Sequence, residues 1–111
     1  MVIIGGGPAG YAAALYGAGI RMNVALIEKD KVGGTCLHVG CIPAKELLET
    51  AAVFRTVAHA ETFGVKASAP IVDFSVTQTR KQSVIDNLFK GLSGLLKHRK
   101  VTLFDGVGQL W

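Results

Sequence analysis

The two cysteines of this chain are suited to covalent chemistry, and they lie close together. Cys36 and Cys41 are separated by four residues within GGTCLHVGCIPAK, the stretch 33–45. In a regular helix their Cα atoms would lie roughly 8–9 Å apart, whereas a disulfide requires a separation below about 7 Å. Gly40 can break the helix between them, because glycine tolerates positive φ, and Pro43 suits the first turn of a new helix. The stretch therefore favours two thiols brought together just before a helix.

Two other interpretations of the cysteines remain open at this point. They are small apolar residues that a core can bury, and together with His38 and His59 they could form a zinc site. The spacing lacks the C-x-x-C pairs typical of zinc, so we expect no metal ligands. Without a secretory signal, close cysteines favour redox chemistry over a structural disulfide. We expect His38 itself to be a bystander that faces solvent or substrate.

A glycine-rich turn follows a short apolar run at the start of the chain. Residues 2–4 predict a fully buried parallel strand. Gly5, Gly7 and Gly10 match G-x-G-x-x-G, in which the first glycine makes the turn, the second lets the backbone approach a pyrophosphate, and the third allows close helix–strand packing. A helix over residues 11–18 would then direct its N-terminal N–H groups at phosphate.

An acidic residue completes this pattern. Residues 23–27 predict a second buried strand, and Glu28 follows it, eighteen residues after Gly10. A carboxylate at this place is suited to bind ribose hydroxyls; the alternative is a surface glutamate before the polar turn 29–31. The order of strand, glycines, helix, strand and acid favours an α/β, Rossmann-like nucleotide-binding domain with a parallel sheet.

The cysteine stretch resembles the redox-disulfide motif of the flavin-dependent disulfide oxidoreductases. This family includes dihydrolipoamide dehydrogenase, glutathione reductase and mercuric reductase. Leu37 and Ile42 are most similar to dihydrolipoamide dehydrogenase, since glutathione reductases usually carry valines there. His38 and Ala44 depart from the Asn and the Ser or Thr that are more common in that family. Neither residue supplies a redox atom, so the departures concern the substrate more than the chemistry.

The resemblance implies a FAD-binding domain in which Cys36 and Cys41 are the catalytic pair. Cys41 would contact the isoalloxazine and Cys36 would exchange with outside thiols. Lys45 would contact the flavin and stabilise a thiolate. Together with the glycine turn and the acid, the resemblance assigns cofactor contacts to Gly5, Gly7, Pro8, Gly10, Glu28, Lys29, Gly34, Thr35, Lys45 and Gly108.

The implied reaction passes electrons between a dithiol and a nicotinamide cofactor, through the cysteine pair and FAD. The dithiol would be dihydrolipoamide-like, as a small molecule or on a lipoyl domain, and the complete enzyme would use NAD, form a homodimer and lie in the cytoplasm. The alternatives are a glutathione- or mercuric-reductase-like enzyme and a non-catalytic nucleotide-binding fragment. The resemblance covers residues 1–111 but only the N-terminal portion of the FAD-binding domain. We therefore expect the NAD-binding and interface domains to be absent and the chain alone to be inactive.

The remainder of the chain predicts mainly helix. An apolar face that includes Leu48 favours a helix from Pro43 to about residue 61, with Gly64 as a left-handed cap. Asp73 and Ser75 compete as the N-cap of a second helix that reaches residue 97 and buries Leu88, among others. Strands are expected at 101–104 and from residue 109 to Trp111.

Composition argues against nucleic-acid and membrane roles. The net charge is +4, but the basic run 97–100 suits a helix C-terminus, and no aromatic interleaving supports base stacking. The first twenty residues carry no charge, yet they contain six glycines and no basic segment before the apolar run. We therefore expect a soluble core rather than a membrane span or a targeting signal.

Overall fold

A computed structural model describes residues 1–110, so the last residue of the predicted strand at 109–111 lies outside it. The elements, in chain order, are β1 (Val2–Ile4), α1 (Pro8–Gly19), β2 (Ala25–Glu28), α2 (Gly34–His38), α3 (Cys41–Ala58), the 3-10 helix η1 (Ala60–Phe63), α4 (Phe74–His98) and β3 (Thr102–Asp105). The α/β architecture with a parallel sheet is therefore confirmed. No strand forms at residues 109 and 110.

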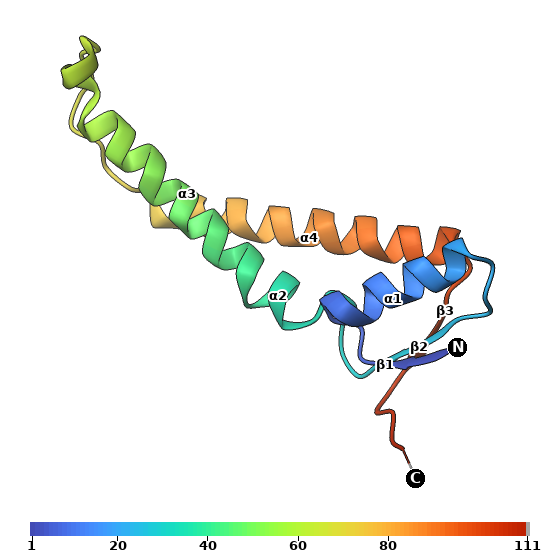
Figure 1. The fold of residues 1–111 in the computed structure, drawn as a ribbon. Helices are drawn as coiled ribbons and strands as arrows, with labels where there is room; N and C mark the ends of the chain where they lie inside the picture. The colour runs from blue at the N-terminus through green and yellow to red at the C-terminus, as the bar shows by residue number, and fades with distance from the viewer. Residues whose placement is uncertain (111) are drawn as a thin grey trace.

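The sheet has the strand order β1-β2-β3, with Ile3, Leu26 and Leu103 in one row of the register. In Figure 1, α1 and the second half of α4 lie on the same side of this sheet. The core lies between them and includes the fully buried Leu26 and Leu96. The helices thus hold the strand ends, and the loops that follow them, in fixed positions.

The face of the sheet opposite α1 and α4 is not covered by any helix of residues 1–110. Val2 is 69% exposed, Ile4 46% and Phe104 54%. Successive side chains of a strand point to opposite faces, and the helices cover only one face, so the prediction of a fully buried first strand is wrong for these positions. Gly108 of the C-terminal segment approaches this face: a Cβ there would lie 2.9 Å from Cγ2 of Ile4.

The helix α3 and the first half of α4 extend away from the sheet, with η1 at the far end (Figure 1). The described chain accordingly measures 62 × 26 × 20 Å. No residue of α3 is buried, and Leu48 on its predicted apolar face is 65% exposed. On α4, Leu88 was also expected to be buried but is 45% exposed, because it borders a cavity rather than the core.

Local signals explain where the helices begin and end. Pro8 starts α1 three residues earlier than predicted, because proline at the first helical position has no N–H to leave unpaired. Asp73 rather than Ser75 caps α4, accepting hydrogen bonds from the N–H groups of Ser75 and Val76 at 3.0 and 3.2 Å. Gly64 ends η1 with φ of +77°, as predicted. None of the helices in residues 1–110 combines the length and the apolar character needed to cross a membrane.

Candidate functional site

Each glycine of the first turn has a different structural task. Gly5 has φ of +95° and donates its N–H to Ile27 O at 2.8 Å, so it turns the chain at the end of β1. A Cβ on Gly10 would lie 1.7 Å from Gly5 O, so only glycine allows this contact between α1 and the turn. Gly7, the N-cap of α1, has an ordinary φ of −68° and open space where a Cβ would stand. The backbone at Gly7 is therefore open to a ligand.

Glu28 binds the glycine turn through its carboxylate. Its Oε2 accepts from Gly6 N–H at 2.6 Å and its Oε1 from Asp30 N–H at 3.0 Å. The Gly6 hydrogen bond is the main cause that holds the pKa of Glu28 below its ordinary value. Each carboxylate oxygen has a further lone pair, so these bonds leave room for ribose hydroxyls.

Sequence reasoning missed Gly6, although three consecutive glycines were a visible signal. A Cβ on Gly6 would lie 3.1 Å from both Glu28 Oε2 and Val32 Cγ1. Gly6 is buried, and its missing side chain lets the acid at the end of β2 reach the turn after β1. Glu28 therefore stabilises the glycine turn through Gly6 and also borders the open space beside that turn.

We expect Glu28→Gln to lower the free energy of unfolding at pH 7 by about 1–2 kcal/mol, the scale of a hydrogen bond to a charged group. Because the folded-state pKa lies below 4.5, this stabilisation is complete above pH 4.5 and is lost as the pH falls through the lowered value. Urea unfolding between pH 7 and pH 3 measures it. The gap between wild type and variant should close with acid, and the exposed Glu49→Gln should show no such gap.

The redox turn consists of α2, a short link and the start of α3. Cys36 lies within α2, and Cys41 is the first residue of α3. Gly40 between them has φ of −118° and ψ of −109°, so the chain leaves the helix there as predicted, without a positive φ. Glycine is required for space instead, because a Cβ would lie 2.8 Å from Thr35 O. This close approach folds α2 against α3, with Pro43 in the first turn of α3 as predicted.

The two thiols are free and interact with each other. Cys36 is half-buried and Cys41 is exposed. A hydrogen bond with the Cys41 side chain is the main cause that raises the pKa of Cys36, followed by burial, and the positive charge of Lys45 opposes the rise. The Cys41 side chain therefore favours the protonated form of Cys36. Lys45 is exposed on α3, outside the cavities described next.

A groove of about 650 Å³ joins the glycine turn to the redox turn. It is lined by Gly7, Pro8, Glu28, Lys29, Asp30, Lys31, Gly34, Thr35, Cys36, His38, Val39, Gly40 and Cys41. An adjoining cavity of about 260 Å³ shares Glu28 and Lys29 with it and adds Gly5 and Gly108. The structure therefore brings most of the predicted cofactor contacts together. Two predicted contacts, Gly10 and Lys45, border neither space. Gly10 instead packs α1 against the glycine turn.

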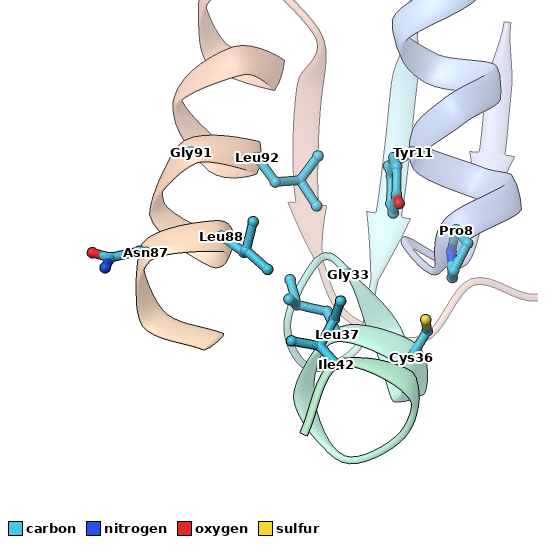
Figure 2. Close-up of a pocket in the computed structure, with 10 residues that line it drawn as sticks. All are labelled: Pro8, Tyr11, Gly33, Cys36, Leu37, Ile42, Asn87, Leu88, Gly91 and Leu92. Atoms are coloured by element: carbon cyan, nitrogen blue, oxygen red, sulfur yellow. The ribbon is translucent and has the colours of Figure 1, made fainter. Parts of the chain in front are cut away.

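A second, mainly apolar cavity of about 390 Å³ lies on the other side of Cys36. Its lining residues are Pro8, Tyr11, Gly33, Cys36, Leu37, Ile42, Asn87, Leu88, Gly91 and Leu92. Figure 2 shows Leu88 and Leu92 of α4 pointing into it, while the Asn87 amide points away and the Cys36 sulfur lies beside Pro8. Sequence reasoning missed this cavity, because α4 follows the cysteines by more than thirty residues. Cys36 thus borders both cavities, and Cys41 borders the groove.

The zinc alternative is not supported. Within residues 1–110, no three His, Cys, Asp or Glu side chains are grouped so that they could hold a metal ion. His38 instead lies with its Nε2 at 2.9 Å from Val32 O, and His59 lies with its Nδ1 at 2.9 Å from Arg55 O near the end of α3.

Comparison with known proteins gives consistent matches. The family described as "Pyridine nucleotide-disulphide oxidoreductase" matches residues 1–110. Two proteins of Bacillus subtilis (strain 168), both named dihydrolipoyl dehydrogenase, are 44% and 49% identical to this chain, over 99% and 96% of its length. A Chlamydia pneumoniae protein of the same name is 42% identical over 98% of the chain. The chain covers 23%, 24% and 24% of these proteins, so it spans about a quarter of their length.

Solved structures agree on the fold. LpdA from Mycobacterium tuberculosis matches with a TM-score of 0.88 at 24% identity, over 99% of this chain and 24% of that one. The HOCl-induced flavoprotein disulfide reductase RclA from Escherichia coli matches with a TM-score of 0.77 at 30% identity, over 98% of this chain and 22% of that one.

Proposed function

Because this chain belongs to the pyridine nucleotide-disulphide oxidoreductase family, we propose that it is the FAD-binding, disulfide-bearing part of a dihydrolipoyl dehydrogenase-like enzyme. In this proposal FAD occupies the groove, and Cys36 and Cys41 alternate between a disulfide and two thiols. The complete enzyme would transfer electrons between a dithiol and NAD. A homodimeric state and a cytoplasmic location belong to the same proposal.

The observation that carries the proposal is the groove itself, in which the glycine turn and both thiols border one space. The residues present fit a dinucleotide. No side chain caps the N-terminus of α1, so its first N–H groups are free for a pyrophosphate beside Gly7. Glu28 and Lys29 border the adjoining cavity, which suits an adenosine. When bound, FAD would supply a two-electron acceptor for the cysteine pair.

The two cavities support different tasks for the two cysteines. A dithiol that enters the apolar cavity meets Cys36 first, since that side chain borders it. A substrate thiolate would attack Cys36 Sγ of the disulfide, forming a mixed disulfide and releasing Cys41 as a thiolate. The second substrate thiol would then displace Cys36. The substrate thereby loses two electrons and two protons and becomes a disulfide, and the enzyme pair is reduced.

The lining of the apolar cavity also bears on the choice of substrate. The walls formed by Tyr11, Leu88 and Leu92 suit the aliphatic chain of a lipoyl group better than the charged ends of glutathione, which favours the lipoyl substrate over the glutathione alternative.

The test of this proposal is a titration of FAD with the purified chain, followed by flavin fluorescence. We expect quenching that saturates at one FAD per chain and that ADP reverses, because ADP would occupy the glycine turn and the Glu28 cavity. Binding of ADP without FAD would favour the non-catalytic nucleotide-binding alternative. Absence of binding by either nucleotide would contradict the assignment of the groove.

A further inference from the structure

His38 connects the redox turn to two other parts of the fold, in contrast to its expected role as a bystander. Its Nε2 lies 2.9 Å from Val32 O, and its ring meets Phe89 of α4 edge-on, with the centroids 5.3 Å apart at 69°. A carbonyl oxygen only accepts hydrogen bonds, so Nε2 carries the proton that His38 donates. The imidazole is therefore fixed in both orientation and tautomer.

Both anchors of His38 are themselves firmly held. Val32 is 6% exposed and belongs to the hydrophobic core, against which Phe89 also packs. The next residue, Gly33, donates its N–H to Gly6 O at 2.7 Å. Since Gly6 N–H binds Glu28, a continuous set of contacts leads from the redox turn to the glycine turn.

The helix α2 needs such anchors because it is short. It has five residues and no side-chain cap, and an isolated helix of this length is not stable in water. Its position, and with it that of Cys36, is set by tertiary contacts. Disulfide formation depends on the distance and direction between two Cβ atoms, so a loosened α2 lowers the fraction of time in which Cys36 can reach Cys41.

We propose that His38 is a positioning residue for the cysteine pair. Its hydrogen bond to Val32 O holds α2 so that Cys36 stays within bonding reach of Cys41, and this raises the equilibrium constant for disulfide formation. The inference rests on the proposed redox function of the pair. It concerns a side chain that borders the groove and that acts on the cysteine pair through the position of α2.

The test measures the thiol–disulfide equilibrium of the full chain in mixtures of reduced and oxidised glutathione. Cys36 and Cys41 lose two electrons and two protons as their S–S bond forms, and one oxidised glutathione becomes two thiols. Quenching with an alkylating reagent and mass determination give the oxidised fraction. We expect His38→Phe, which keeps a ring but has no donor, to lower the equilibrium constant roughly fivefold to tenfold, the scale of one lost hydrogen bond.

Matched variants separate positioning from general stability. His38→Gln places an amide donor at a similar reach and should stay near the wild-type value. His59→Phe removes a comparable ring-to-carbonyl contact at the end of α3 and should change nothing. Thermal unfolding of the reduced proteins checks that each variant is folded. If His38→Phe does not fold, His38→Leu carries the same expectation.

Each outcome bears on a different claim. A wild-type pair that stays reduced at every glutathione ratio overturns the proposed function itself. Suppose that the wild-type pair oxidises and that the equilibrium constant for disulfide formation is unchanged in His38→Phe or His38→Leu. That result overturns the positioning role and leaves the proposed function standing. An equal loss in His38→Gln and His38→Phe overturns the assignment of the effect to the hydrogen bond.

Discussion

Replacing Gly7 with valine is expected to abolish FAD binding without loss of the fold. The φ of −68° at Gly7 is one that valine adopts, and nothing lies within 4 Å of the added Cβ. The two methyl groups would therefore be accommodated by the protein but would stand where the pyrophosphate must approach the N-terminus of α1. We expect the affinity for FAD to fall at least a hundredfold, about 2.8 kcal/mol.

The measurement is best made in a chimera in which residues 1–110 replace the matching segment of the Bacillus subtilis relative that is 44% identical. Flavin content and thermal unfolding are then read from the same sample. Gly19→Val is the matched control, since Gly19 also has open space around its Cβ but lies at the other end of α1. It should keep its flavin. Full flavin content in Gly7→Val would show that the phosphate assignment is wrong.

The sequence predicted those features that depend on neighbouring residues. The positive φ at Gly5 and the close contact at Gly10 follow from the glycine spacing, which leaves few backbone paths between a strand and a helix. The cap at Gly64 and one of the two candidate caps of α4 were predicted for the same reason. The start of α1 was predicted three residues too late, although Pro8, whose fixed φ favours the first helical position, was a local signal for it.

Burial and long-range contacts could not be predicted in the same way. The apolar pattern of β1 does not reveal whether a second layer covers the sheet, and Val2 and Ile4 are exposed in consequence. The contact of His38 with Phe89 joins residues that are fifty-one positions apart. The apolar cavity beside Cys36 depends in the same way on where α4 returns along α1. Such features arise from tertiary packing, which no local pattern encodes.

The two single serine variants of the cysteine pair are expected to differ from each other in kind. Cys36→Ser should lose dithiol turnover in the chimera by at least about a thousandfold, since effects of this size follow removal of a nucleophile. It should nevertheless keep a long-wavelength thiolate–flavin absorbance, because Cys41 borders the groove and remains intact. Cys41→Ser should lose both turnover and that absorbance.

The positions of the two thiols give the reason for this order. Cys36 borders the apolar cavity as well as the groove, whereas of these two spaces Cys41 borders only the groove. Leu48 on α3 is 65% exposed and borders neither space, so Leu48→Thr is the control that should keep both signals. Absorbance in Cys41→Ser and none in Cys36→Ser would reverse the roles. Identical spectra in both variants would mean that neither sulfur alone is the flavin's partner.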